Sequence, residues 1–449
     1  MCRMPENQKI ASAARILWAW IFFLVLMGAN PSDASYDYIN ISNPFLKKIP
    51  VAVPAFKNLS DASAGADSAL NVSGMMIEFI EFTGYFTIID RAAFIDKPDD
   101  AGIDRTRINF GNWTAIGAEL LITGGIHMQD NHLEMEFRLF DTFKADLLFG
   151  KRYTGRVGDE REMVRRFCGE VIYRLTGRQG LFDSQIAFVS TTTGNKEIYR
   201  CDFDGYNPVR VTHTNALTLS PAWSPDGSNL AFVSYEKGKP DIYFQPLRGK
   251  RESVSSRDGI NITPAWVPKT TYLAATLSFE GDEEIYLLTQ SGEIVKRLTK
   301  SWGIDVSPTF SPDGKRMAFV SRRSGTPQIH IQDTAGGNTF RVTYDGRYNT
   351  QPAWSPAGDR IAYSGMKDGQ LNIYVINADG RGNVQLTRNA GNNESPCWSP
   401  DGNMIAFAST RTGKSRIFVM TASGTDQRQL LEQSGEQTSP SWSPRLSGN

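Results

Sequence analysis

One motif returns at an almost constant interval through the second half of the 449-residue chain. It consists of a proline, any residue, an aromatic residue, any residue and a second proline, and successive copies start 43 or 44 residues apart. The first prolines of the six copies are Pro221, Pro264, Pro308, Pro352, Pro396 and Pro440. A period of about 44 residues with short strands in each unit is typical of the blades of a β-propeller. This half of the chain is therefore predicted to be mainly β.

A second series predicts how the propeller closes. Glycines recur with the same step from Gly194 to Gly413, each followed by an apolar pair such as Ile198-Tyr199. The glycine series begins without an aromatic motif before it, and the last aromatic motif, around Trp442, is followed by no further strands. We therefore expect residues 439–443 to form the innermost strand of a blade whose other strands lie within residues 185–212. This pairing gives six blades and a ring without free sheet edges.

The preceding residues do not share the repeat and are predicted to form a small α/β domain. Strands are expected at 49–56, 85–89, 120–126 and 133–139, and helices at 66–82 and around the apolar stripe 164–175. The predicted organisation is a signal peptide at 1–34, an α/β domain with an extended N-terminal arm at 35–177, and a six-bladed propeller at 183–449. Residues 177–183 are interpreted as a short linker.

The first 34 residues have the pattern of a secretory signal peptide. Arg3, Lys9 and Arg15 precede an uninterrupted apolar run, Ile16 to Met27, and Ser32-Asp33-Ala34 offers a cleavage site. Twelve residues at 1.5 Å each are too short for a hydrocarbon core of about 30 Å, although an uncleaved anchor is the alternative. The mature chain is expected to be soluble and to lie outside the cytoplasm.

Composition and motifs argue against several function classes. Lysine and arginine number 48, as do aspartate and glutamate, so no basic surplus points to nucleic acid. The four cysteines have no zinc-like or disulfide-like spacing, and His127 and His132, on either side of a predicted loop, lack a third ligand. We predict no catalytic residue, no metal and no cofactor. Asp226, Asp313 and Asp401 are interpreted as turn residues.

One end of the propeller carries the candidate binding residues. A short polar or acidic residue stands three positions before each motif proline: Thr218, Asn261, Asp305, Asn349, Asn393 and Gln437. These residues are expected to ring one mouth of the propeller, with Leu217, Ile260, Trp302, Ile304 and Tyr348 as an apolar set around them. The sequence predicts a protein-binding surface there. In the alternative interpretation, the polar residues only cap and turn the backbone.

The signal peptide, the domain that opens with Ile49-Pro50-Val51-Ala52-Val53-Pro54, and the Trp-Ser-Pro-Asp-Gly blades together resemble the TolB family of the Tol-Pal system. The resemblance implies a non-enzymatic, monomeric adaptor of the Gram-negative envelope that supports outer-membrane integrity and cell division. It implies that the propeller mouth binds the peptidoglycan-associated lipoprotein Pal. It also implies that the mature N-terminal arm binds the inner-membrane protein TolA, here through Tyr36, Tyr38, Ile39 and Ile41, which suit an extended strand. The protein would reach membranes only through these partners.

The alternative from another class is a propeller enzyme or ligand-binding protein that acts on a periplasmic peptide or glycan. Such chemistry needs an acid-base pair or a nucleophile at the mouth. The acidic residues near the mouth are Asp305, Asp258, Glu394 and Glu436, and they are scattered over different blades. The sequence therefore favours the adaptor.

Overall fold

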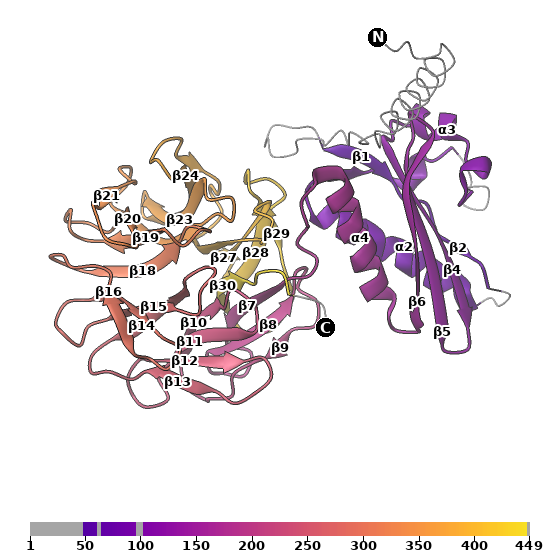
Figure 1. Cartoon of the computed structure of the whole chain (residues 1–449). Coiled ribbons are helices and arrows are strands. Elements are labelled where there is room, and N and C mark those ends of the chain that lie inside the picture. The colour runs from indigo at the N-terminus through magenta and orange to yellow at the C-terminus, as the bar shows by residue number, and fades with distance from the viewer. Residues whose placement is uncertain (1–47, 61–63, 96–101, 447–449) are drawn as a thin grey trace, which may run out of the picture. The chain divides into compact units, whose positions relative to one another are not determined.

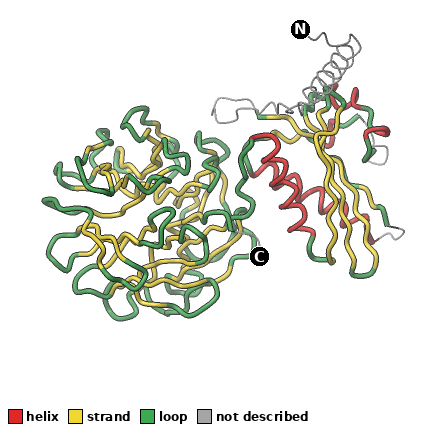
Figure 2. The backbone as a smooth tube through the Cα atoms, in the orientation of Figure 1, coloured by secondary structure: helices red, strands yellow, loops and turns green. Residues whose placement is uncertain are grey.

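The computed structural model describes residues 48–60, 64–95 and 102–446. The predicted signal peptide and the arm residues Tyr36, Tyr38, Ile39 and Ile41 lie outside the described residues. Within the described ranges, no helix is both long enough and apolar enough to span a membrane. Figure 2 shows helices only in the N-terminal part, whereas the repeat region consists of strands and loops.

Residues 185–442 form six four-stranded sheets, which are the predicted blades (Figure 1). The innermost strands are β10 (Thr218–Trp223), β14 (Asn261–Trp266), β18 (Asp305–Phe310), β22 (Tyr348–Trp354), β26 (Asn393–Trp398) and β30 (Gln437–Trp442). The second strands are β11 (Asn229–Ser234), β15 (Leu273–Leu277), β19 (Arg316–Ser321), β23 (Arg360–Lys367), β27 (Met404–Thr412) and β7 (Gln185–Ser190). The third strands are β12 (Asp241–Pro246), β16 (Glu284–Leu288), β20 (Gln328–Asp333), β24 (Gln370–Asn377), β28 (Lys414–Thr421) and β8 (Glu197–Asp202). The outermost strands are β13 (Glu252–Ser255), β17 (Ile294–Arg297), β21 (Phe340–Arg341), β25 (Val384–Gln385), β29 (Arg428–Gln429) and β9 (Val209–Arg210). We number the blades 1 to 6 in this order.

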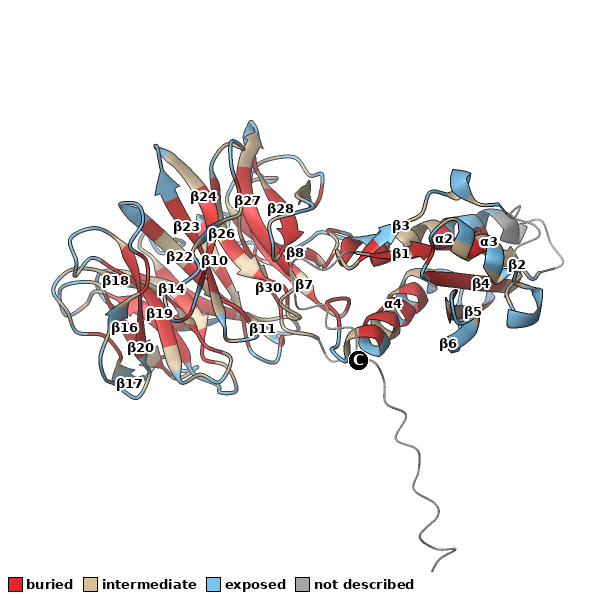
Figure 3. Cartoon of the chain, turned by 90° about the horizontal axis from the view of Figure 1, so that it is seen from above, coloured by how far each residue is buried: buried red, intermediate tan, exposed pale blue. Residues whose placement is uncertain are grey.

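The ring closes as the sequence predicts. In blade 6, β30 pairs antiparallel with β7, so that Trp442 lies opposite Ile186 and the two ends of the repeat region share one sheet. The second strands are buried almost throughout, because each blade packs against a neighbour on both faces (Figure 3). Continuous apolar runs such as Leu230 to Val233 satisfy this double burial.

The aromatic residue of the motif ties three of the blades to the one before them. The indole Nε1 of Trp223, Trp266 and Trp398 donates to a backbone carbonyl of the preceding blade, at 3.0 to 3.2 Å. Trp442 Nε1 donates instead to Ser184 Oγ at 2.8 Å, directly before β7. A register shift in every innermost strand, just before this aromatic residue, marks a bulge that re-aims the chain at the same point of each blade.

The N-terminal region is an α/β domain, as predicted. Its sheet has the order β3-β1-β4-β5-β6, with β2 paired to β4. The strands are β1 (Ile49–Ala52), β2 (Lys57–Asn58), β3 (Phe86–Ile88), β4 (Leu120–Gln129), β5 (His132–Asp141) and β6 (Asp146–Arg156). The helices are α2 (Ala64–Phe82), α3 (Phe110–Ala115) and α4 (Glu160–Thr176), with short 3-10 turns η1 (Arg91–Ala93) and η2 (Arg105–Arg107). The sequence did not predict β6 or α3.

The predicted linker is packed rather than free. Gly177 ends α4 in a left-handed conformation, with φ of 68°, which favours glycine. A few residues later Leu181 and Phe182 are completely or almost completely buried. Phe182 contacts Phe79 of α2 and Phe203, which follows β8, with ring centroids 6.1 and 5.2 Å apart. Residues 177–183 therefore contribute to a core instead of separating two.

Candidate functional site at the strand-start mouth

The six polar residues singled out in the sequence gather at one end of the ring of innermost strands. Five of them are the first residue of their strand, and Asn349 is the second residue of β22. Each innermost strand contacts the innermost strands of the blades on either side, from β10 through β30 and back to β10. The starts of these strands therefore meet around one opening, which we call the strand-start mouth.

The structure contradicts the expectation that these six side chains form an accessible ring. Thr218, Asn261, Asp305, Asn393 and Gln437 have no exposed surface, and Asn349 is only 2% exposed. A buried polar group must find hydrogen-bond partners. Five of these side chains find one in the loop that leads into their own strand, namely Thr218, Asn261, Asp305, Asn349 and Asn393. Gln437 Oε1 instead accepts from the backbone N–H of Ile417 in β28 at 3.1 Å. The alternative interpretation, in which they cap and turn the backbone, describes what their side chains do.

Asn261 and Asn349 illustrate the capping. Asn261 Oδ1 accepts from Ser255 Oγ at 2.6 Å, and its Nδ2 donates to the Arg257 carbonyl at 2.7 Å. Asn349 Nδ2 donates both to Gln328 Oε1 and to the Asp345 carbonyl, each at 2.8 Å. Each amide thus holds the loop before its strand in one conformation.

Asp305 is the only acidic member of the six. Its Oδ2 accepts from Arg323 Nη2 at 2.7 Å and from Ser301 Oγ at 3.0 Å. Burial raises the pKa of the Asp305 carboxyl, and the hydrogen bonds and the nearby Arg323 charge oppose that rise. Asp305 is therefore a structural ion-pair partner, and it is not free to act as a general base or to meet a ligand.

The aromatic and apolar neighbours of the polar six do reach the surface. Trp302, in the loop between β17 and β18, is 93% exposed. Tyr348 at the start of β22 is 40% exposed and Leu217 before β10 is 38% exposed, while Ile260 and Ile304 are half-buried. Tyr344, in the same loop as Tyr348, is 70% exposed and was missed in the sequence, because its counterparts in other blades have no common residue type.

The opposite end of the ring has a different character. The motif residues of all six blades line a hollow of about 480 Å³ there, which we call the turn mouth. Its walls are the motif aromatics, such as Trp223 and Phe310, and prolines of the following turns, with Cys397 and Lys269 among the few reactive or charged groups. The aspartates of the Ser-Pro-Asp-Gly turns act as predicted: Asp226 Oδ1 accepts from Ser224 Oγ at 2.5 Å.

The described ranges contain no set of side chains that could bind a metal ion. His127 pairs with Glu134 across the β4–β5 hairpin and His132 with Gln129, so the two histidines do not face each other. No group of three or more histidine, cysteine, aspartate or glutamate side chains could hold a metal ion in the part of the chain that is described. His330 lies 2% exposed beside Phe319, as expected for a core position, and burial lowers its pKa to about 4.

The geometry defines a class: a closed six-bladed β-propeller preceded by an α/β domain, with exposed aromatic side chains on a rigid polar base at one mouth. The TolB beta-propeller domain family matches residues 172–446, and the TolB amino-terminal domain family matches residues 37–148. The chain therefore belongs to the TolB family.

Known proteins support the same assignment. The chain is 56% identical over 269 residues to the Tol-Pal system protein TolB of Desulfosudis oleivorans, covering 60% of this chain and 61% of that one. It is 42% identical over 210 residues to the Tol-Pal system protein TolB of Syntrophus aciditrophicus, covering 46% of each. The match spans less than two thirds of either relative's length. The crystal structure of TolB from Acinetobacter baumannii superposes with a TM-score of 0.77 at 26% identity, covering 89% of this chain and 97% of that one.

Proposed function

We propose that this chain is a non-enzymatic periplasmic adaptor of the Tol-Pal system. Its relatives carry the Tol-Pal name, and its own fold offers exposed aromatic side chains at the strand-start mouth as a docking surface. In this role it acts as a monomer, needs no cofactor, and contributes to outer-membrane integrity and cell division by connecting envelope proteins.

One observation carries the assignment of the partner surface. Trp302 exposes 93% of its surface on a loop in which Ser301 donates its hydroxyl to the buried Asp305 carboxylate at 3.0 Å. Large exposed aromatic side chains on a rigid base are typical of the residues that dominate protein–protein binding energy, because their contact area costs little conformational entropy. We propose that Trp302, Tyr348, Ile260 and Ile304 contact the peptidoglycan-associated lipoprotein Pal. The buried residues Thr218, Asn261, Asp305, Asn349, Asn393 and Gln437 position those loops.

The second proposed partner is TolA, bound by the N-terminal arm. Residues 35–41 alternate Tyr36 and Tyr38 with polar residues and continue with Ile39 and Ile41, a composition suited to pairing with a sheet edge of another protein. This contact is independent of the strand-start mouth, so the two can be tested separately.

A pull-down of the mature chain, residues 35–449, from solubilised envelope of its own source tests the proposal. The whole chain is used because Leu181 and Phe182 are buried in a shared core and a propeller-only fragment would expose them. We expect the wild-type chain to recover a peptidoglycan-binding lipoprotein, and Trp302→Ala to recover at least tenfold less. Phe143→Ala, which removes a 68% exposed aromatic from the α/β domain, is the matched control and should behave as wild type.

Two results would count against the proposal. Equal recovery by Trp302→Ala and wild type would remove the strand-start mouth as the lipoprotein site. A chain lacking residues 35–41 that still recovers TolA would remove the arm as the TolA site.

A further inference from the structure

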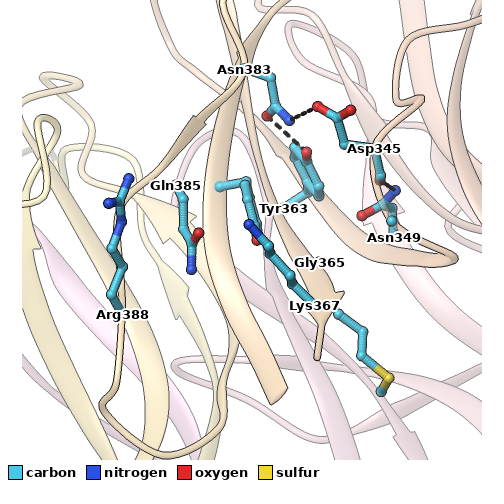
Figure 4. Close-up of a pocket in the computed structure, with 11 residues that line it drawn as sticks. Asp345, Asn349, Tyr363, Gly365, Lys367, Asn383, Gln385 and Arg388 are labelled. Atoms are coloured by element: carbon cyan, nitrogen blue, oxygen red, sulfur yellow. Dashed lines mark hydrogen bonds between the residues drawn. The ribbon is translucent and has the colours of Figure 1, made fainter. Parts of the chain in front are cut away.

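A pocket of about 440 Å³ opens on blade 4 beside the strand-start mouth (Figure 4). Tyr363 of β23 and Tyr374 of β24 both line it, stacked with their ring centroids 5.4 Å apart and their planes 18° from parallel. Gly365, Asp345, Asn383 and Arg388 are among its other lining residues. The pocket is thus an aromatic platform bordered by polar groups.

Blade 3 shows what the fold places at the corresponding position. There Ser321 pairs with Asp305, and two residues later Arg323 folds back over the blade. The Arg323 Cζ lies 5.3 Å from the centre of the Phe319 ring. Its Nε donates to Ser321 Oγ at 2.8 Å, and its Nη2 donates to Asp305 Oδ2 at 2.7 Å. A guanidinium group therefore fills the space between the second-strand aromatic residue and the strand-start mouth.

Blade 5 repeats this arrangement with different residues. Ser409 pairs with Asn393, and Arg411 places its Cζ 5.3 Å from the Phe407 ring centre and 4.4 Å from that of Phe418. Arg411 Nε donates to Ser409 Oγ, and Nη2 donates to Asn393 Oδ1, both at 2.9 Å. Two blades with otherwise different contacts thus build the same guanidinium site.

Blade 4 keeps the site but has no arginine at the position that fills it in blades 3 and 5. Gly365 pairs with Asn349, as Ser321 and Ser409 pair with their partners, and Lys367 stands two residues later, where blades 3 and 5 have arginine. The β23–β24 hairpin stays regularly paired as far as Lys367 and Gln370, and Lys367 is exposed. No ion pair involving Lys367 or Arg388 is found among the described residues.

The acceptors that hold the arginine in blade 5 have counterparts in blade 4. Asn349 corresponds to Asn393 of blade 5. Its Nδ2 donates to Gln328 Oε1 and to the Asp345 carbonyl, and its Oδ1 faces Gly365. Gln427, which accepts from Arg411 Nη1 at 2.9 Å, directly precedes the outermost strand of blade 5, as Asn383 does in blade 4. Asp345 adds a carboxylate, whose Oδ2 accepts from Asn383 Nδ2 at 3.1 Å.

We propose that this pocket binds a guanidinium group from outside the chain. The group would lie over the Tyr363–Tyr374 platform and donate to the Asn349 amide oxygen and the Asp345 carboxylate. Arginine suits such a site because a planar guanidinium stacks on aromatic rings and donates along several directions at once. The rim cations Lys367 and Arg388 are exposed and therefore screened by solvent. The inference goes beyond the adaptor proposal and does not depend on it.

The test is a ligand-observed NMR titration of the mature chain with Nα-acetyl-arginine methylamide at fixed ionic strength. We expect saturable binding with a dissociation constant on the order of 1 mM, the range for one stacked and hydrogen-bonded group. The lysine analogue should bind at least fivefold more weakly, because an ammonium ion does not stack or form a fork. Asp345→Asn should weaken binding of the arginine probe at least fivefold.

Asp379→Asn is the matched control, because Asp379 is a second exposed carboxylate on the same blade that does not line the pocket. It should bind the arginine probe as wild type does. Absence of saturation, equal binding of the lysine analogue, or equal losses in Asp345→Asn and Asp379→Asn would overturn the proposal.

A second arm identifies where the guanidinium comes from. If saturating arginine probe reduces lipoprotein recovery in the pull-down, the ligand is an arginine side chain of that partner. If recovery is unchanged while the probe still saturates the pocket, the ligand is a free guanidinium compound. Should the wild-type chain recover no lipoprotein, the adaptor proposal fails, and the titration still decides the pocket.

Discussion

The two mouths of the propeller are built on opposite principles. At the turn mouth every blade contributes the same group, a motif aromatic with its flanking proline, and the result is a uniform apolar hollow. At the strand-start mouth three blades contribute a buried asparagine and the other three a threonine, an aspartate or a glutamine, their partners differ, and the exposed groups differ from blade to blade. The comparison teaches that the repeated residues hold the ring together, while the positions that vary between blades shape its surface.

The largest effect is expected from the turn mouth. Trp442→Ala removes a 7% exposed indole from the closing strand and its hydrogen bond to Ser184. Truncation of a buried tryptophan costs about 3–5 kcal/mol, and here the loss falls where the two ends of the ring are joined. Urea unfolding followed by circular dichroism measures the change in the free energy of unfolding. A loss below about 1 kcal/mol would mean that β30 does not hold the ring closed.

At the strand-start mouth the largest loss is expected from Asp305→Ala. The substitution leaves Arg323 without the carboxylate that it contacts at 2.7 Å. Breaking a fully buried ion pair costs about 3–5 kcal/mol, but the Arg323 side chain is 25% exposed and remains partly solvated, so we expect about 2 kcal/mol. The same urea experiment measures it.

Asp313→Ala serves as the comparison for Asp305, because Asp313 is an acidic turn residue of the same blade that accepts from Ser311 at the surface. It should destabilise the protein clearly less than Asp305→Ala does. Equal losses of unfolding free energy in the two variants would mean that the burial of Asp305 and its ion pair contributes nothing to stability. A charge-changing substitution at Asp305 is for the same reason a poor test of partner binding.

Trp442 and Asp305 also show what could and could not be predicted from the sequence. The motif spacing predicted six blades and the pairing of β30 with β7, because a strict period leaves few other ways to bury each apolar strand. The same sequence suggested that Asp305 and its counterparts would be accessible, since their residue types are polar. Only the three-dimensional path of the loops shows that the chain wraps around them.

The missed strand β6 has a related cause. Of its eleven residues only Phe149 and Tyr153 are buried, so the sequence lacks the alternation that marks a half-buried strand. Pairing with β5 along its whole length, and not apolar patterning, defines it. Local sequence patterns thus predicted β5, whose buried residues alternate, and missed β6, whose residues do not.

A third prediction concerns the pH dependence of stability. In the third strand of blade 3, His330 takes the position that tyrosine or phenylalanine occupies in the other blades. Burial lowers the His330 pKa from 6.5 to about 4, so between these values the unfolded chain binds more protons than the folded one. Stability should therefore fall as the pH is lowered from 6.5 towards 4 and be fully present above 6.5. At pH 5 the loss from this residue is about 2 kcal/mol.

His330→Phe should remove that part of the acid dependence. Urea unfolding at pH 7.5 and pH 5 gives the free energy of unfolding of both chains at each pH. We expect the difference between the two pH values to be smaller in the variant by about 2 kcal/mol. The same pH dependence in both chains would show that folding does not lower the pKa of His330.

The smallest effect on stability is expected where the largest effect on binding is proposed. Trp302 is 93% exposed and belongs to no described buried cluster, so Trp302→Ala should change the free energy of unfolding by less than about 0.5 kcal/mol. Trp442→Ala is the internal contrast, because both variants remove an indole, one from the surface of one mouth and the other from the wall of the opposite mouth.

This pair of tryptophans tests the division between the two mouths directly. If Trp302→Ala destabilised the chain as Trp442→Ala does, reduced lipoprotein recovery could not be assigned to a lost contact. If Trp302→Ala leaves stability unchanged and lowers recovery at least tenfold, the exposed indole contributes to recognition and not to the ring. The buried polar residues beneath it would then act as the rigid base that fixes its loop, which is the role that their hydrogen bonds indicate.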